Sequence, residues 1–143
     1  MEEATIKLLE ECSQGCRMAV ESMDQISKYV TGDRMENLLS DYRRKHDQLG
    51  KRVDEMLKEG GAQPKQPGVA ASAMSWVTTE VKMKLKNDNS QISTLMMDGC
   101  NMGIQSISKA MNQNAAASKE SRGLAQELVR TEESFMQDLK EFL

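Results

Sequence analysis

Two long apolar stripes with helical spacing constrain the fold of this chain most strongly. Apolar or small side chains recur at alternating intervals of three and four residues between positions 9 and 30, and again between positions 35 and 56. This spacing places each stripe along one side of an α-helix, because the helix has 3.6 residues per turn. The stripes predict helices over residues 2–30 and 34–59. Their members are Leu9, Cys12, Cys16, Ala19, Met23, Ile26 and Val30, then Met35, Leu39, Tyr42, His46, Leu49, Val53 and Met56.

A short turn is expected between these two helices. Gly32 is expected to end the first helix, since glycine is common just past a helix C-terminus. Asp33, followed three residues later by Glu36, predicts a capping box at the start of the second helix. A turn this short makes the two helices an antiparallel hairpin.

The chain contains only two prolines, Pro64 and Pro67, and both lie in a glycine-rich linker over residues 59–68. Because proline disrupts helix interiors, its absence elsewhere favours helix in the rest of the chain. Three more helices are predicted, over 69–86, 90–111 and 118–142. Asp88 or Asn89 is expected to cap the second of these, and a turn is expected somewhere within 112–121.

Apolar stripes again support these three ranges, with one conflict. Residues 81–86 alternate apolar and charged side chains, which is typical of a strand. A single strand would have no partner in this chain, so helix is the preferred interpretation. The stripes are Ala70, Met74, Val77, Val81 and Leu85; Ile92, Met96, Ile104, Ile107 and Met111; and Leu124, Leu128, Thr131, Phe135, Leu139 and Phe142.

Helix lengths predict how these elements pack. A helix over 69–86 would be about 27 Å long at 1.5 Å per residue, enough to cross a bundle lengthwise. Such a crossover sets the second and fourth helices parallel, and it joins two antiparallel hairpins. The sequence therefore predicts one all-α domain over residues 1–143, a ferritin-like four-helix bundle with a long crossover containing a short helix. Small residues at matching inward positions of the hairpins, such as Cys16 with Gly103 and Ala19 with Ser106, are expected to bring helices close together.

Charge and cysteine content exclude several classes of protein. The chain has 22 acidic and 19 basic residues, and this net charge of -3 argues against a nucleic-acid partner. No apolar run approaches the roughly 20 residues of a membrane span, and the acidic N-terminus does not resemble a secretion signal. The odd number of thiols, Cys12, Cys16 and Cys100, suits a reducing compartment. A soluble cytoplasmic protein without a membrane partner is expected.

Four segments carry a resemblance to a known family. They are Leu-Leu-Glu-Glu-Cys-Ser-Gln-Gly at 8–15, Gln-Pro-Gly at 66–68, Trp76, and Leu-Ala-Gln-Glu-Leu-Val-Arg-Thr-Glu-Glu at 124–133. Over nearly its whole length the chain resembles the ferritin-like superfamily, and more narrowly a small bacterial family of helical bundles carrying a domain of unknown function. The resemblance implies a bacterial cytoplasmic protein with stress- or spore-associated relatives. Ferritin-like families often contain a di-iron or di-manganese carboxylate site, so the resemblance implies that the chain could carry the ligands of such a site.

The ligands of such a dimetal site are not in the sequence. The site needs one Glu from each of two helices and a Glu-x-x-His from each of the other two. The chain has a single histidine, His46, and Arg43 stands where its carboxylate partner should be. The inward stripes of the first and fourth helices offer Cys12, Cys16, Gly99 and Gly103 instead of Glu. We therefore expect a degenerate site, with no catalytic residues, no cofactor and no enzymatic activity.

Cys12, Cys16 and His46 offer an alternative metal site. Cys12 and Cys16 share one helix face, and antiparallel pairing sets His46 within a turn of Cys16. Two thiolates and an imidazole suit zinc, with Glu132 or Cys100 as a fourth ligand. Buried free cysteines and hydrogen-bonded core histidines are more common than such sites. No metal is therefore expected, and His46 is expected to lie in the core with a hydrogen-bond partner.

These observations predict a non-catalytic interaction or structural module. The alternative function is a metal- or redox-binding protein that uses Cys12, Cys16 and His46. A twofold homodimer is also expected, because apolar side chains on the fourth helix exceed what one stripe can bury. The surplus side chains are Met97, Ile104 and Met111, with Trp76 and Met83 off the stripe of the crossover helix.

Overall fold

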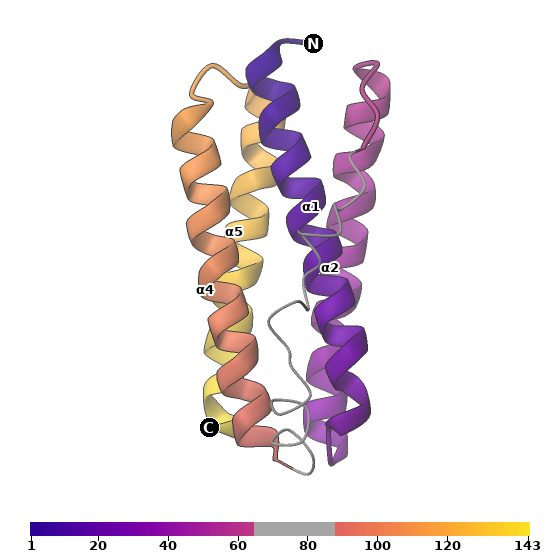
Figure 1. The fold of residues 1–143 in the computed structure, drawn as a ribbon, viewed down its shortest axis with the longest axis vertical. Helices are drawn as coiled ribbons and strands as arrows, with labels where there is room; N and C mark the ends of the chain where they lie inside the picture. Colours follow the sequence, from indigo (N-terminus) through magenta and orange to yellow (C-terminus); the bar gives the residue numbers. More distant parts are fainter. Residues whose placement is uncertain (65–87) are drawn as a thin grey trace.

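The computed structural model describes residues 1–64 and 88–143, which form four long α-helices (Figure 1). These residues contain no strand, so the all-α prediction is confirmed for them. None of their helices is long and apolar enough to cross a membrane. The helices are α1 (Glu3–Ile26), α2 (Asp33–Glu59), α4 (Asn89–Gln113) and α5 (Lys119–Leu139), with short 3-10 helices η1 (Ser27–Tyr29) and η3 (Lys140–Phe142) after α1 and α5.

Predicted helix bounds agree with the observed ones to within a few residues. The first helix was expected to continue to residue 30, but a 3-10 turn follows Ile26. The last helix ends in the same way after Leu139. The helix predicted over 69–86, the alternating segment at 81–86 and residues 65–68 of the predicted linker lie outside the described residues.

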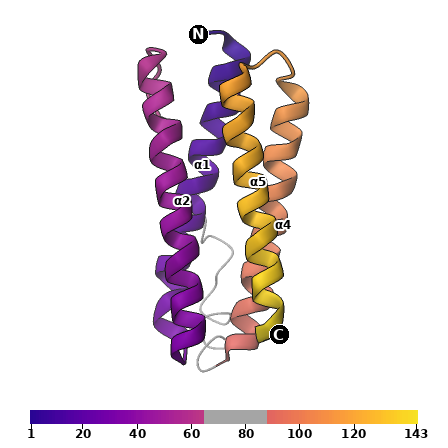
Figure 2. The same cartoon turned by 180° about the vertical axis from the view of Figure 1, so that it is seen from behind.

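The helices form two hairpins that pack side by side. α1 packs along α2, and α4 packs along α5; α1 also contacts α4 and α5, and α2 contacts α5. α1 and α5 run in one direction while α2 and α4 run in the other, as both views show (Figures 1 and 2). The two chain termini lie at opposite ends of the bundle (Figure 2).

The predicted capping box at the start of α2 is wrong. Gly32, not Asp33, is the N-cap residue, and no side chain caps this helix end. Gly32 has φ of 84°, a conformation that only glycine adopts readily, because the chain reverses tightly after η1. Its carbonyl accepts the N–H of Glu36 at 3.2 Å. Asp33 therefore lies inside the first turn, where its carboxylate favours the helix through the macrodipole.

Side chains tie the two hairpins together at one end of the bundle. Asp88 caps α4 by accepting the N–H of Gln91 at 3.1 Å, which confirms one of the two predicted caps. The amide of Asn89 instead holds the turn between α1 and α2. It donates to the Thr31 carbonyl at 2.6 Å and accepts the Thr31 N–H at 3.1 Å. The start of α4 is thereby fixed against the first hairpin.

The opposite end is tied by the turn between α4 and α5. This turn occupies residues 114–117, inside the range predicted for it. Ser118 caps α5 by accepting the N–H of Ser121 at 3.2 Å. The backbone N–H of Ser118 also donates to the hydroxyl of Thr5 on α1 at 2.8 Å. The second hairpin is thus anchored to the first at both ends.

Two apolar clusters fill the bundle. Along α2, Tyr42 belongs to one cluster and Leu49 to the other, and His46 lies between them in sequence. Along α5, Phe135 and Leu128 are divided in the same way, with Glu132 between them. The core is therefore interrupted near its middle by one polar residue from each of two helices.

Two stripe predictions are displaced by one residue. Leu57 is buried where Met56 was expected to be, and Glu132 is buried where Thr131 was expected to be. A straight α-helix drifts by about 20° per heptad from a strict three-four repeat, so the inward position moves on by a residue after several turns. In α5 the predicted positions Leu128, Phe135 and Leu139 remain buried, and Glu132 is buried among them because it lies nearer than Thr131 to the centre of their helix face.

Candidate functional site

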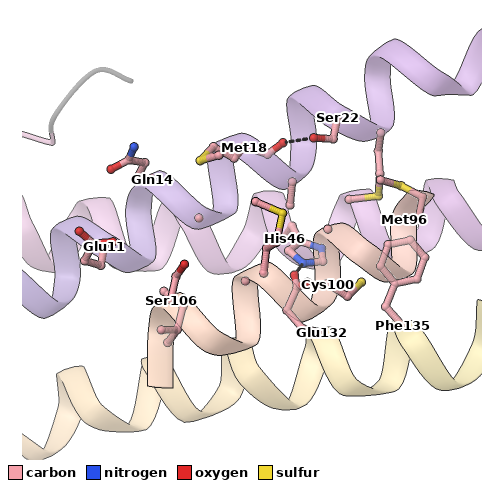
Figure 3. A pocket seen from close by; sticks show the side chains of 17 residues that line it. Glu11, Gln14, Met18, Ser22, His46, Met96, Cys100, Ser106, Glu132 and Phe135 are labelled. Atoms are coloured by element: carbon pink, nitrogen blue, oxygen red, sulfur yellow. Dashed lines mark hydrogen bonds and ion pairs between the residues drawn. The ribbon is translucent and has the colours of Figure 1, made fainter. Parts of the chain in front are cut away.

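His46 on α2 and Glu132 on α5 form a buried pair at the centre of the bundle. The His46 side chain is fully buried, and Glu132 is 7 % exposed. Nε2 of His46 contacts Oε1 of Glu132 directly (Figure 3). Nδ1 of His46 lies 2.7 Å from the carbonyl oxygen of Tyr42. The prediction that His46 is a hydrogen-bonded core residue is therefore confirmed, and both of its ring nitrogens have partners.

These contacts place one proton on Nδ1 of His46 and a second proton between Nε2 and Glu132. The Tyr42 carbonyl can only accept, so Nδ1 of His46 carries a hydrogen and donates it. One proton is then shared between Nε2 and Oε1 of Glu132, because each arrangement needs one donor there. Either imidazolium donates to carboxylate, or carboxylic acid donates to imidazole. Both arrangements have zero net charge, so the core buries no net charge here.

Two residues of α4, Cys100 and Gly103, also lie next to the Glu132 carboxyl group. The Cys100 thiol is hydrogen-bonded to Glu132, and burial together with the charge of Glu132 raises the pKa of Cys100 above its ordinary value. A Cβ atom at Gly103 would lie 3.4 Å from Oε2 of Glu132. Glycine at position 103 therefore leaves room for the carboxyl group, and this oxygen faces α4.

The other two thiols lie on α1 in the apolar cluster beyond the pair. Burial raises the pKa of Cys12 to about 12. Burial also raises the pKa of Cys16, with smaller contributions from Cys12 and Glu132. Cys16 packs against Gly50 of α2, where an added Cβ would lie 3.0 Å from the Cys16 Cβ. Thiols with raised pKa values remain protonated at neutral pH, and the protonated form is a poor nucleophile and metal ligand.

The residues in the bundle centre do not fit a dimetal centre. Glu132 is the only buried carboxylate in the part of the chain that the structure describes, whereas the ferritin-like centre uses several. Within residues 1–64 and 88–143, no three His, Cys, Asp or Glu side chains form a group that could hold a metal ion. Cys12, Cys16, His46 and Glu132 were the candidate metal ligands. The structure brings His46 and Glu132 into contact and places Cys12 and Cys16 in an apolar cluster.

A cavity of about 370 Å³ lies beside the pair, between α1 and α4. His46, Glu132 and Cys100 line it together with Gly99 and Gly103 (Figure 3). At Gly99 an added Cβ would meet no atom within 4 Å. The remaining wall includes five thioether or aromatic side chains, Met18, Met23, Met96, Met102 and Phe135, and four polar ones, Glu11, Gln14, Ser22 and Ser106.

Sequence reasoning missed this cavity. Small inward residues were expected to bring helices close together. Gly103 does lie against the Glu132 carboxyl group, but Gly99 has no atom within 4 Å of its Cβ position and lines the cavity. The available signal was the pair of glycines four residues apart on one helix face. Glycine both permits close approach and leaves a void, and only the position of the facing helix decides which occurs.

Comparisons with known proteins add no identification to this geometry. No protein-family model matches the chain, and neither the curated proteins nor the solved structures contain a match. Its function is therefore argued from its own residues, chiefly from the His46–Glu132 pair and the cavity beside it.

Proposed function

We propose that this chain is a ferritin-like bundle in which the His46–Glu132 pair occupies the place of a dimetal centre. In this proposal it works as a non-catalytic interaction or structural module. The observation that carries it is the engagement of His46, the only histidine of the chain, by Tyr42 and Glu132 at both ring nitrogens. A histidine held in this way cannot bind a metal or transfer a proton without breaking a buried hydrogen bond.

The directions of the helices support the ferritin-like topology. α2 and α4 run the same way, and the end of α2 and the start of α4 lie at opposite ends of the bundle (Figure 1). A single long crossover between two antiparallel hairpins requires this arrangement. A short connection would instead make α2 and α4 antiparallel.

The chemistry of the site supports a role without catalysis. The buried thiols are kept protonated, as the pKa of about 12 for Cys12 indicates. Glu132 shares a proton with His46 at Oε1 and is hydrogen-bonded to the Cys100 thiol. General acid–base and nucleophilic catalysis need a group that is free to exchange a proton with substrate or to attack it. The resemblance to stress- and spore-associated bacterial bundles supports a cytoplasmic setting.

We also propose that the chain forms a twofold homodimer through α4. Ile104 is half-buried but belongs to neither apolar cluster of the bundle. Met102 is 55 % exposed on the same helix. Met97 and Met111, which were expected to add to this surface, pack partly against the core clusters. Met102 lies two residues from Ile104, about 200° around the helix, and lines the cavity, so the apolar surface that supports dimerisation is centred on Ile104.

Elemental analysis tests the central proposal. Protein purified without chelator, and protein incubated anaerobically with Fe²⁺ or Zn²⁺ and then desalted, is expected to hold far less than one metal ion per chain. Oxidation of Fe²⁺ in its presence is expected to match that in buffer. A stoichiometric metal that is lost on His46→Gln would overturn the proposal. Loss on Cys12→Ser as well would establish the alternative, a metal- or redox-binding protein using Cys12, Cys16 and His46.

A further inference from the structure

The cavity beside the His46–Glu132 pair has the size and lining of a small-molecule site. Its volume of about 370 Å³ lies within the range of ligand pockets, roughly 300–1,000 Å³. Such pockets combine mostly apolar walls with a few polar groups that orient the ligand. Here methionine and Phe135 side chains form much of the wall. Glu132, His46 and Cys100 supply the inner polar groups, and the other polar side chains of the lining are Glu11, Gln14, Ser22 and Ser106 (Figure 3).

Two glycines of α4 contribute to this space. The space extends from the buried pair to the surface, where Glu11, Met102 and Ser106 of its lining are exposed. Gly99 and Gly103 line the space from α4, and nothing lies within 4 Å of the Cβ position of Gly99. A larger residue at position 99 would fill the space without displacing a neighbour.

The polar groups of the cavity favour a hydrogen-bond donor with positive charge. Two carboxyl groups line it, Glu132 inside the bundle and the exposed Glu11, while none of the described lining residues is Lys or Arg. The imidazole of His46 is committed to Glu132 and Tyr42. Oε2 of Glu132 is an acceptor in both proton arrangements of the pair, because the shared proton lies at Oε1.

The walls suit the apolar part of the same ligand. Methionine side chains adapt to irregular shapes, and their polarizable sulfur atoms contact aromatic and aliphatic groups favourably. The ring of Phe135 adds a surface that tolerates a nearby cation. An anionic ligand would meet two carboxyl groups, and the basic residue among the described lining is His46, whose two ring nitrogens are already engaged by Tyr42 and Glu132.

We infer that this cavity binds a small apolar amine in its protonated form. The ammonium group donates to Oε2 of Glu132, and the hydrocarbon part lies against Met18, Met96 and Phe135. This ligand site is independent of the proposed non-catalytic role, because binding involves no metal and no chemical step.

Three ligands that differ only in the head group test the charge preference. Octylamine, octanol and octanoate are titrated into the protein by calorimetry at neutral pH. A hydrogen bond to a charged donor is stronger than a neutral one by about 1.4 kcal/mol, so octylamine is expected to bind about tenfold more tightly than octanol. Octanoate is expected not to bind. Equal affinities for octylamine and octanoate would overturn the inference.

Substitutions locate the site. Gly99→Leu fills the cavity and is expected to abolish octylamine binding. Gly123→Leu is the matched control, since Gly123 is an exposed glycine on α5, also with no atom within 4 Å of its Cβ position, and does not line the cavity. It is expected to bind like the parent protein. Undiminished binding to a folded Gly99→Leu protein, shown by its thermal melting transition, would place the ligand elsewhere and end the proposal.

The role of Glu132 is tested by Glu132→Gln. The amide can still donate to Nε2 of His46, so this variant keeps the core hydrogen bond and replaces the carboxyl oxygen that faces the cavity with the oxygen of a neutral amide. The tenfold preference for octylamine over octanol is expected to disappear while octanol binding is retained.

Methyl-labelled methionine spectra provide an independent readout. Octylamine should shift Met18 and Met96 and leave Met56, which does not line the cavity, unchanged, and the reverse pattern would contradict the proposal.

Discussion

His46 shows what a polar residue needs in order to occupy an apolar core. An imidazole without partners would cost several kcal/mol on burial, so both nitrogens must be satisfied inside the protein. Tyr42, one helical turn earlier, satisfies Nδ1 locally, and Glu132 satisfies Nε2 from another helix. The local bond sets the tautomer, while the long-range bond links α2 to α5.

A double-mutant cycle tests the coupling of the pair. His46→Leu leaves the Glu132 carboxyl group buried without its partner, and we expect it to lower the free energy of unfolding by about 3 kcal/mol. Glu132→Leu orphans Nε2 in the same way. Replacing both is expected to cost about 2 kcal/mol less than the sum of the single changes, because neither polar group is left unpaired. Urea denaturation measures these values, and additive costs would show that the contact contributes nothing.

Cys12 makes stability depend on alkaline pH. Its pKa is raised by burial from 9.0 to about 12, so the folded chain retains the thiol proton when the unfolded chain has lost it. The stabilisation is complete below about pH 9 and is lost as pH rises towards 12, at about 1.4 kcal/mol per pH unit. Between pH 8 and pH 10 the parent is expected to lose about 1.4 kcal/mol more stability than Cys12→Ala. Parallel urea-denaturation results for the two proteins would contradict the buried thiol.

Among the helices and turns, the start of α2 is the point where local sequence rules and structure disagree. Asp33 and Glu36 have the spacing of a capping box, yet the N-cap is Gly32 with φ of 84° and ψ of 149°. Glycine is selected there because other residues are strained in this region. The tight reversal between α1 and α2 therefore depends on backbone conformation and not on a side-chain cap.

Gly32→Ala is expected to destabilise the protein by about 2 kcal/mol, because alanine is strained at this φ and ψ. Gly123→Ala is the control. It lies within α5 with open space around the added methyl group, and alanine should stabilise the helix by about 1 kcal/mol. Thermal or urea unfolding gives both values. A neutral Gly32→Ala would mean that the turn can relax into an ordinary conformation.

The whole bundle is assembled from two hairpins joined by polar ties at both ends and a buried pair in the middle. Asn89 binds Thr31 at one end, Ser118 binds Thr5 at the other, and His46 contacts Glu132 between them. An Arg52–Glu127 ion pair at 2.9 Å joins the hairpins on the surface as well. These directional contacts set the register of two surfaces that apolar packing alone would allow to slide.

Light scattering tests the proposed dimer at the scale of the molecule. The parent is expected at about twice the chain mass of 16.0 kDa at micromolar concentration. Ile104→Glu places a charge in the proposed interface and should restore a mass near 16.0 kDa. Gln105→Glu adds the same charge to an exposed neighbouring position and should leave the dimer intact. A parent mass near that of one chain would contradict the proposal.

The positions of the four described α-helices and the burial of His46 follow from the sequence alone. Apolar spacing over many turns identifies a helix and its inward face, because the helix period is constant. Asp88 was recognisable as a cap for a similar reason, since capping involves only the adjacent turn. Each of these properties depends on residues that are close together in the chain.

The partner of His46, the cap at Gly32 and the cavity beside Gly99 were decided only by the tertiary structure. Periodicity shows that a residue faces inward, but not which residue of another helix it meets. That depends on the axial offset and rotation of packed helices, and a shift of one residue exchanges Thr131 for Glu132 at the core. Glycines on helix faces differ in the same way: Gly50 packs closely against Cys16, whereas Gly99 has open space at its Cβ position. The distance from a glycine to the facing helix is set by the neighbouring side chains that separate the two helices.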